Sequence, residues 1–218
     1  MRKKLTEITL VAGIMLALAF AFSCSSDDDG SGGNKITNYK TKLIGDQVWM
    51  LENLNYKVAG SVCYDNDSDN CKKYGRLYNW TTAMALPDNC KNIRCDSLIS
   101  AKHKGICPSG WHIPNDDEWN TFIDFIGDPA TAGTELKSAN GWNSKGNGKD
   151  TYEFSALPGG SGDSEGNFND IGGYGYWWSA SEISDYGANY LHIDYDGEGV
   201  YWINDHKSNL FSIRCLQD

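Results

Sequence analysis

Hydrophobic residues recur at helical spacing in one segment near the middle of the chain. The spacing i, i+3, i+4 and i+7 is met by Trp119, Phe122, Ile123 and Ile126. Residues at this spacing share one face of a helix. Asn115 can cap the first turn, Glu118 stands where its carboxylate can reach back to the cap, and Gly127 can end the helix. We therefore predict a helix after Asn115 that buries its apolar face against other elements.

Two other segments have helical patterns. Residues 74–86 place apolar groups on one helical face, and Pro87 cannot continue a helix. Residues 128–139 form a second short helical segment, with Ala132 and Leu136 on its inner face. Both segments are expected to pack beside the central helix.

The remaining apolar residues alternate with polar ones or form short β-branched and aromatic runs, which are typical of strands. We expect a hairpin of residues 39–43 and 47–54 across Gly45-Asp46, buried rather than at a sheet edge because both its faces are apolar. A glycine-rich loop at 159–175 is long enough to be functional or mobile. The other expected strands are residues 152–157, 176–180, 188–195, 200–204 and 210–216. Helices beside such strands predict a compact α+β domain.

The amino terminus has the pattern of a secretion signal. A positively charged start precedes an apolar run at residues 8–22. This run is shorter than the roughly 20 residues that a membrane-spanning helix needs. Ala21 and Ser23 before Cys24 resemble a loose bacterial lipoprotein box, which implies cleavage before Cys24 and acylation of its thiol. The alternative is an ordinary signal peptide followed by a spare cysteine.

A short tether follows the predicted lipid attachment site. Residues 27–29 are aspartates, and residues 30–33 are glycine and serine, which form flexible linkers. The acidic run resembles the export signal of Bacteroidetes lipoproteins, although a charge run is often only a solvated segment. We expect an outer-membrane lipoprotein at the cell surface whose acyl chains hold the membrane. The expected divisions are a signal peptide at 1–23, a lipidated tether at 24–38 and a folded domain at 39–218.

The chain is acidic. It contains 19 basic and 29 acidic residues, a net charge of −10. Removing residues 1–23 takes away three basic residues and one acidic residue, which leaves 16 and 28 and a net charge of −12. Nucleic-acid binding requires clustered cations, so this balance argues against a nucleic-acid partner.

Six cysteines remain when Cys24 is assigned to lipid. An even number in an exported chain indicates disulfides, here with 15 connectivities to choose from. We favour nearest-neighbour pairs for the first four, because each pair flanks a polar loop, and this leaves the last two to join each other. The favoured pairs are Cys63 with Cys71, Cys90 with Cys95, and Cys107 with Cys215. The third closes about a hundred residues and could contribute roughly 4 to 5 kcal/mol.

Five sequence motifs carry a family resemblance. They are VWMLENLNY (48–56), CPSGWHIPNDDEW (107–119), FSALPGG (154–160), WWSAS (177–181) and FSIRC (211–215). Together they resemble the Fibrobacter succinogenes major paralogous domain over about residues 39–218, and more distantly the C-type-lectin-like and formylglycine-generating-enzyme-like folds. The resemblance implies a single C-type-lectin-like domain of two main helices on short, mostly antiparallel strands, stapled by disulfides. It implies little about chemistry, because the family has no well-defined activity.

Aromatic residues in the carboxyl third are candidates for ligand binding, because rigid rings with a polar edge bind at low entropy cost. For any one of them the alternative is a place in the core. Asn204 and Asp205 extend the set, since a Trp-Asn-Asp stretch holds calcium-bound sugar in C-type lectins; here Ile203 interrupts it. The candidates are Tyr176, Trp177, Tyr186, Tyr190, Tyr201, Trp202, Asn204 and Asp205.

We expect no cofactor, and the one candidate that the sequence offers is Ca²⁺. Asp65, Asp67 and Asp69 alternate like positions 1, 3 and 5 of a calcium loop. Asn70 stands where that loop needs glycine, and Arg76 stands where it needs glutamate. The alternative is a polar turn closed by a disulfide. Separately, Ser97 lies in an Asp-Ser-Leu tripeptide that resembles a Bacteroidetes O-glycosylation site.

No pattern indicates catalysis. The four histidines lie at no metal-ligand spacing, and neither a nucleophile elbow nor a phosphate loop occurs. We therefore expect a non-catalytic adhesion domain that recognises an extracellular glycan. The alternatives are an assembly subunit that binds a surface protein and a glycoside-active enzyme with paired carboxylates.

Overall fold

A computed structural model describes residues 39–218. The predicted signal peptide, the acylated Cys24 and the tether lie outside the described residues. Within residues 39–218, no helix is both long and apolar enough to cross a membrane.

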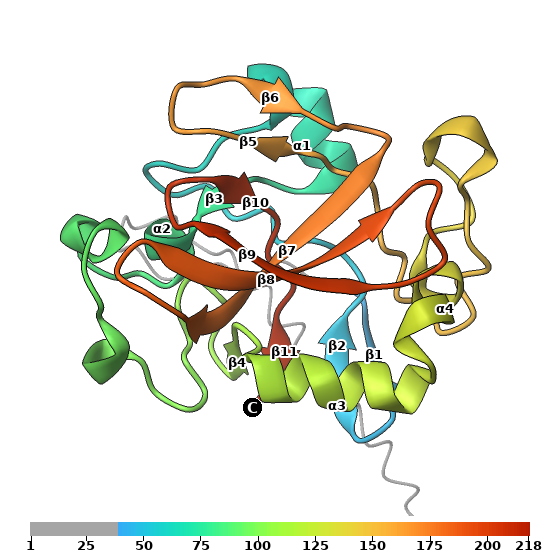
Figure 1. Ribbon diagram of the computed structural model, residues 1–218, viewed down its shortest axis with the longest axis horizontal. Helices are drawn as coiled ribbons and strands as arrows, with labels where there is room; N and C mark the ends of the chain where they lie inside the picture. Colours follow the sequence, from blue (N-terminus) through green and yellow to red (C-terminus); the bar gives the residue numbers. More distant parts are fainter. Residues whose placement is uncertain (1–38) are drawn as a thin grey trace, which may run out of the picture. The chain divides into compact units, whose positions relative to one another are not determined.

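The domain combines three small sheets with short helices (Figure 1). The first sheet has the order β1-β2-β11-β4. Its strands are β1 (Thr41–Ile44), β2 (Gln47–Met50), β4 (Trp111–His112) and β11 (Leu216–Gln217). All its pairings are antiparallel. The sheet therefore joins the first described strands to the last one.

The second and third sheets form the rest of the β-structure. The second has the order β3-β10-β5-β6, and the third has the order β7-β8-β9. Figure 1 shows the third sheet across the middle of the domain, with β5, β6 and α1 on one side and β1, β2 and α3 on the other. The strands are β3 (Tyr78–Asn79), β5 (Ser161–Gly162), β6 (Phe168–Asn169), β7 (Tyr174–Glu182), β8 (Gly187–Asp194), β9 (Tyr201–His206) and β10 (Leu210–Phe211).

The main helix forms where the apolar spacing predicts it. In α3, the side chain of Asn115 accepts from Glu118 N, and Glu118 accepts in return from Asn115 N at 3.0 Å. This capping box satisfies two amides that have no helical partner. The helices are α1 (Ser68–Tyr74), α2 (Trp80–Ala83), α3 (Asp116–Ile126) and α4 (Pro129–Leu136), with 3₁₀ turns η1 (Tyr64–Asn66), η2 (Asp88–Lys91), η3 (Asp96–Leu98) and η4 (Asn143–Lys145).

Two hydrophobic clusters fill the domain, and single strands supply both. On β2, Trp49 enters the cluster beneath α3, while its neighbour Met50 enters the other. On β7, Trp177 and Trp178 divide in the same way. Successive side chains of a strand point to opposite faces, so two consecutive apolar residues pack into two different hydrophobic clusters. This explains why these segments read as hydrophobic on both faces.

All three favoured disulfides are present. They join Cys63 to Cys71, Cys90 to Cys95, and Cys107 to Cys215. The third lies in the second hydrophobic cluster and closes a separation of 108 residues. It fastens the turn before β4 to the segment before β11.

Two predicted elements are wrong. Residues 74–86 do not form one helix, because Gly75 has φ 79° and the chain then enters β3 and the short α2, which Asn79 caps. Residues 152–157 do not form a strand, since Glu153 and Ser155 have φ values of 59° and 51°. Most apolar residues of both segments are nevertheless buried, so the sequence indicated burial correctly although the predicted helix and strand do not form.

Three other expectations need correction. The β1–β2 hairpin forms across Gly45-Asp46, but β1 is a sheet edge rather than a buried strand. The glycine-rich loop at 159–175 contains the β5–β6 pair. Residues 210–216 divide into β10 and β11 because Ser212 pairs with Trp177 between them. The partner of Ser212 is 35 residues away in sequence, and local patterns do not reveal it.

Candidate functional site

A buried polar cluster organises one side of the domain. Arg214 is fully buried, and its Nη1 donates to Phe154 O at 2.6 Å and to Met50 O at 3.2 Å. Its Nε and Nη2 donate to Asn53 Oδ1 at 3.1 and 2.8 Å. No ion pair to Arg214 occurs among residues 39–218, so neutral oxygens bind this guanidinium. Burial lowers the pKa of Arg214 to about 9, although the negative charges of Asp150 and Glu52 raise it.

Asn53 completes this cluster, which we call the arginine hub (Arg214, Asn53 and the groups that bind them). Trp177 Nε1 donates to Asn53 Oδ1 at 2.8 Å, and Asn53 Nδ2 donates to Tyr74 O at 2.9 Å. Buried polar groups are costly unless they are hydrogen-bonded, and here each has partners. Four of the five motifs meet at this hub: those at 48–56, 154–160, 177–181 and 211–215. Their residues hold the fold together.

The fifth motif has its own buried interaction. His112 is fully buried, with Nδ1 at 2.7 Å from Asp218 Oδ1 and Nε2 at 2.9 Å from Glu118 Oε1. Burial lowers the pKa of His112, but the two carboxylates raise it more, so the net shift is upward. The imidazole therefore links β4 to the capping box of α3.

An open groove of about 750 Å³ lies over the arginine hub. Asn53 and Ser155 contribute to both the hub and the groove lining. The size falls within the range of about 300 to 1,000 Å³ that is usual for ligand pockets. The lining residues are Tyr39, Lys40, Leu51, Glu52, Asn53, Asn55, Cys71, Lys72, Lys73, Gly75, Ser138, Ala139, Asn140, Asp150, Glu153, Ser155 and Leu157.

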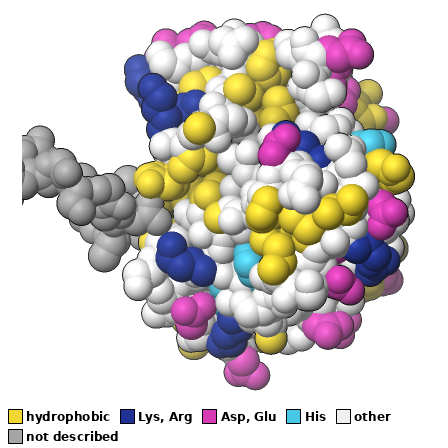
Figure 2. Space-filling view, turned by 90° about the vertical axis from the view of Figure 1, so that its left-hand side faces the viewer, with side chains coloured by type: hydrophobic (Ala, Val, Ile, Leu, Met, Phe, Trp, Pro, Cys, Tyr) yellow, Lys and Arg dark blue, Asp and Glu magenta, His cyan; other side chains and the backbone are white. Residues whose placement is uncertain are grey.

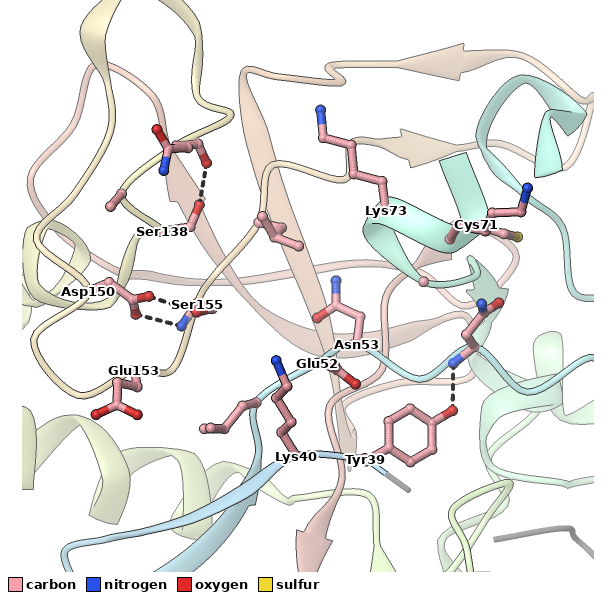
Figure 3. Close-up of a pocket in the computed structure, with 17 residues that line it drawn as sticks. Tyr39, Lys40, Glu52, Asn53, Cys71, Lys73, Ser138, Asp150, Glu153 and Ser155 are labelled. Atoms are coloured by element: carbon pink, nitrogen blue, oxygen red, sulfur yellow. Dashed lines mark hydrogen bonds between the residues drawn. The ribbon is translucent and has the colours of Figure 1, made fainter. Parts of the chain in front are cut away.

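The two walls of the groove differ in charge. Figure 3 shows Lys73 beside Cys71 on one side and Asp150 with Glu153 on the other, while Lys40 lies below Asn53. Several of these groups are already engaged. Asp150 accepts from Ser155 N and Oγ, both at 2.7 Å. Glu153 forms an ion pair with Lys42 at 2.6 Å.

The predicted ligand-binding residues lie elsewhere, and the structure brings only some of them together. On one face of the third sheet, Tyr176, His192 and Tyr201 are direct neighbours across β7, β8 and β9. The Tyr176 ring stacks on Tyr174 at 5.9 Å between centroids, and His192 stacks on Tyr201 at 5.0 Å. We call these four residues the aromatic row. Tyr201 is 41 % exposed at its end.

A cleft of about 200 Å³ adjoins the aromatic row. Tyr176 lies in both, and its hydroxyl donates to Asp170 Oδ2 at 3.0 Å. Burial raises the pKa of Tyr190 to about 12, with a smaller contribution from Asp205. The cleft is lined by Ser161, Gly162, Asp163, Asn169, Asp170, Tyr176, Tyr190, Asp205, Asn209 and Phe211. Three predicted residues, Tyr176, Tyr190 and Asp205, therefore share this cleft.

The other predicted residues are separated from it. Trp177 is fully buried in the core and donates to the arginine hub. Trp202 and Asn204 line a different small pocket with Asp116 and Asn189. Tyr186 is exposed in the β7–β8 turn. A strand places alternate residues on opposite faces, so the Trp202–Asp205 run cannot act as one surface.

The candidate calcium residues have structural contacts. Asp67 caps α1 by accepting from Asp69 N at 2.9 Å, and Asp69 forms an ion pair with Lys72 at 2.7 Å. Asp65 has φ 53° in η1. Among residues 39–218, no three acidic, histidine or cysteine side chains are grouped so as to hold a metal ion. Calcium binding here stays a prediction, as does O-glycosylation of Ser97, which is exposed in η3.

Sequence reasoning missed the groove. Its lining comes from five separate stretches of the chain, and the groove appears only when these meet. The signal that was available lay in the motifs themselves, since four of them surround the groove floor.

Comparison with known proteins identifies a family and nothing closer. A family model described as the Fibrobacter succinogenes major domain matches residues 43–217. No curated protein and no solved structure matches the chain.

Proposed function

The chain belongs to the Fibrobacter succinogenes major domain family, and on this premise we propose that it is a cell-surface lipoprotein whose domain binds an extracellular glycan without catalysis. Acylation of Cys24 would anchor it to the outer membrane, and the following residues would serve as its tether. The folded part would be C-type-lectin-like in the arrangement of its helices and antiparallel strands. Its partners are a glycan and the membrane, not nucleic acid.

The aromatic row beside its small cleft is the observation that carries this proposal. Sugar rings have apolar faces and polar edges, so they stack on aromatic side chains while carboxylates and amides bind their hydroxyls. Tyr174, Tyr176 and Tyr201 supply partly exposed rings, and Asp170 and Asp205 supply acceptors beside them. His192 Nδ1 is buried and has no hydrogen-bond partner among residues 39–218.

The absence of a reactive thiol in the described domain supports a non-catalytic function. All six cysteines of residues 39–218 form disulfides. The formylglycine-generating enzymes, which the sequence motifs resemble distantly, work through reactive cysteines.

A glycan array probed with the mature protein, with and without a calcium chelator, tests the proposal. We expect binding of at least one neutral glycan, with a loss of about tenfold in affinity for Tyr201→Ala, since exposed aromatic anchors dominate such contacts. Tyr186→Ala is the matched control, because Tyr186 is 52 % exposed but lies outside the aromatic row. Binding that survives Tyr201→Ala, or no binding to any glycan, contradicts the proposal. Loss of binding on chelation would restore the calcium hypothesis.

A second candidate is an assembly subunit that contacts a surface protein. Ile93, Leu98 and Ile183 are exposed by 46 %, 52 % and 39 %. Ile93 and Ile183 lie near each other, because Arg94 Nη1 donates to Ile183 O at 2.9 Å. Figure 2 shows the side of the domain on which hydrophobic side chains gather between charged ones. Co-purification of a stoichiometric surface partner that Ile183→Asp abolishes would favour this function.

A further inference from the structure

The groove over the arginine hub shares no lining residue with the cleft beside the aromatic row. We propose that this groove is a second binding site, and that it takes an extended peptide segment carrying both acidic and basic residues. The ligand would belong to another protein at the cell surface. This function is separate from glycan binding and does not depend on it.

The charge distribution favours a ligand with both signs. One wall presents Lys73, and the other presents Asp150 and Glu153 (Figure 3). Lys72 also lines the groove but is paired with Asp69 at 2.7 Å. Lys73 Nζ lies 4.6 Å from the centroid of the Tyr74 ring, and neither Lys73 nor Lys40 makes an ion pair with a carboxylate among residues 39–218. A polyanionic glycan would meet the acidic wall in a chain whose net charge is −10. A peptide can place each charge against the opposite wall.

Apolar contacts lie between the charged walls. Leu51 and Leu157 are partly exposed in the lining, and Ala139 is exposed beside them. The one aromatic ring in the lining is Tyr39, whose hydroxyl accepts from Asn55 N at 3.0 Å. The groove therefore offers aliphatic contacts for side chains rather than a row of rings for sugars.

The edge strand β1 supplies a feature that only a peptide can use. Lys40 O accepts from Leu51 N at 2.9 Å, and Ile44 pairs with Gln47 across the turn. Along an antiparallel edge strand, only every second residue directs its backbone N–H and C=O toward the partner strand. The N–H and C=O groups of Thr41 and Leu43 therefore point away from β2. None of the hydrogen bonds found within residues 39–218 uses these outward groups. A peptide leaving the groove past Lys40 could extend the sheet by pairing with β1.

The floor is rigid before any ligand arrives. Asn53 is 4 % exposed, and its amide is fully engaged by Arg214, Trp177 and Tyr74. A site whose walls rest on a buried hydrogen-bonded network loses little entropy on binding, because its geometry is already set. Most of the conformational entropy lost on binding would therefore be lost by the peptide rather than by the groove.

Selection from a library of short random peptides displayed against the full mature chain tests the proposal. We expect enriched peptides to contain both acidic and basic residues. Their affinity should fall about two- to fivefold for Lys73→Glu, as for a single exposed ion pair. A peptide with the matching acid changed to lysine should regain affinity for Lys73→Glu. Lys102→Glu is the control, because Lys102 is exposed and outside the groove.

The strand contribution has its own pair of variants. Leu43→Pro removes one outward N–H from β1, while Leu43→Ala removes the side chain and keeps that donor. We expect Leu43→Pro to weaken peptide binding and Leu43→Ala to leave it nearly unchanged, with both variants folded by circular dichroism. Failure to enrich any peptide, or equal binding by Lys73→Glu and the natural chain, overturns the proposal. Glycan binding that Lys73→Glu abolishes would also overturn it, by assigning the groove to a glycan.

Discussion

The arginine hub and the aromatic row both contain buried polar groups, but they satisfy them differently. In the hub, the Arg214 guanidinium and the Asn53 amide find their partners within the domain. In the aromatic row, His192 Nδ1 has no partner among the described residues, and Tyr201 lies exposed at the end. A closed network stabilises a fold, whereas an open one can still accept a ligand. The family motifs surround the closed network, which explains why they indicate architecture and say little about ligand.

The disulfide between Cys107 and Cys215 should have the largest effect on stability. Replacing both cysteines by alanine removes a closure of 108 residues, and we expect a loss of about 4 to 5 kcal/mol. The pair Cys63 and Cys71, which closes only 8 residues, should cost about half as much by the same relation. Denaturant unfolding of both double variants measures the difference. Equal losses would contradict the chain-entropy explanation.

Arg214→Met should lower the free energy of unfolding by about 3 to 5 kcal/mol. This loss is expected even though the substitution removes a buried charge that has no carboxylate partner. The reason is that the replacement leaves Phe154 O without a donor and removes two of the three donors to Asn53 Oδ1, which keeps only Trp177 Nε1. Arg214→Lys keeps the charge but lacks the planar fork, so it should recover only part of the loss. Urea unfolding gives the values. A neutral Arg214→Met variant would show that the hub is dispensable for folding.

His112 should make stability depend on pH in a defined direction. Its folded pKa lies above the value of 6.5 for an unperturbed imidazole, so its stabilisation is complete below that value and is lost as pH rises through the folded pKa. We expect the free energy of unfolding to fall as pH rises through the folded pKa of His112. In His112→Gln, this part of the pH dependence should be absent. Unfolding curves of both proteins at stepped pH provide the measurement. An unchanged slope in His112→Gln would assign the pH dependence to other groups.

Substitutions in the aromatic row should have the smallest effect on stability. Tyr201→Ala should change the free energy of unfolding by no more than about 0.5 kcal/mol, since the side chain is partly exposed and lies on an edge strand. The same variant should lose glycan binding. A large destabilisation would make Tyr201 a structural residue and remove the contrast with the hub.

Local patterns predicted the parts of the fold that depend on neighbours in sequence. The apolar spacing and the pair Asn115 and Glu118 gave α3 with its capping box, and the turn residues at 45–46 gave the β1–β2 hairpin. The disulfide pairs followed from spacing. The prediction of one helix at residues 74–86 was wrong, although the spacing of its apolar residues fits a helix. Gly75 and the cap at Asn79 interrupt the helical backbone there.

The candidate sites show the same division. The sequence placed Tyr176, Tyr190, Tyr201 and Asp205 in one candidate set with Trp177, and only the structure separates them, because the Trp177 ring lies in the core. The groove was not predicted, because its walls come from stretches far apart in the chain.

By itself, the sequence determined the family, the main helix, the disulfide framework and the acidic balance of the chain, because each depends on residue types at short or fixed spacings. Only the tertiary structure decided which polar groups are satisfied and which remain open. Arg214 finds its acceptors up to 164 residues away, and a hydrogen bond over such a separation has no local signal. The physical reason is that burial and pairing are properties of segments brought together by folding, not of any segment alone.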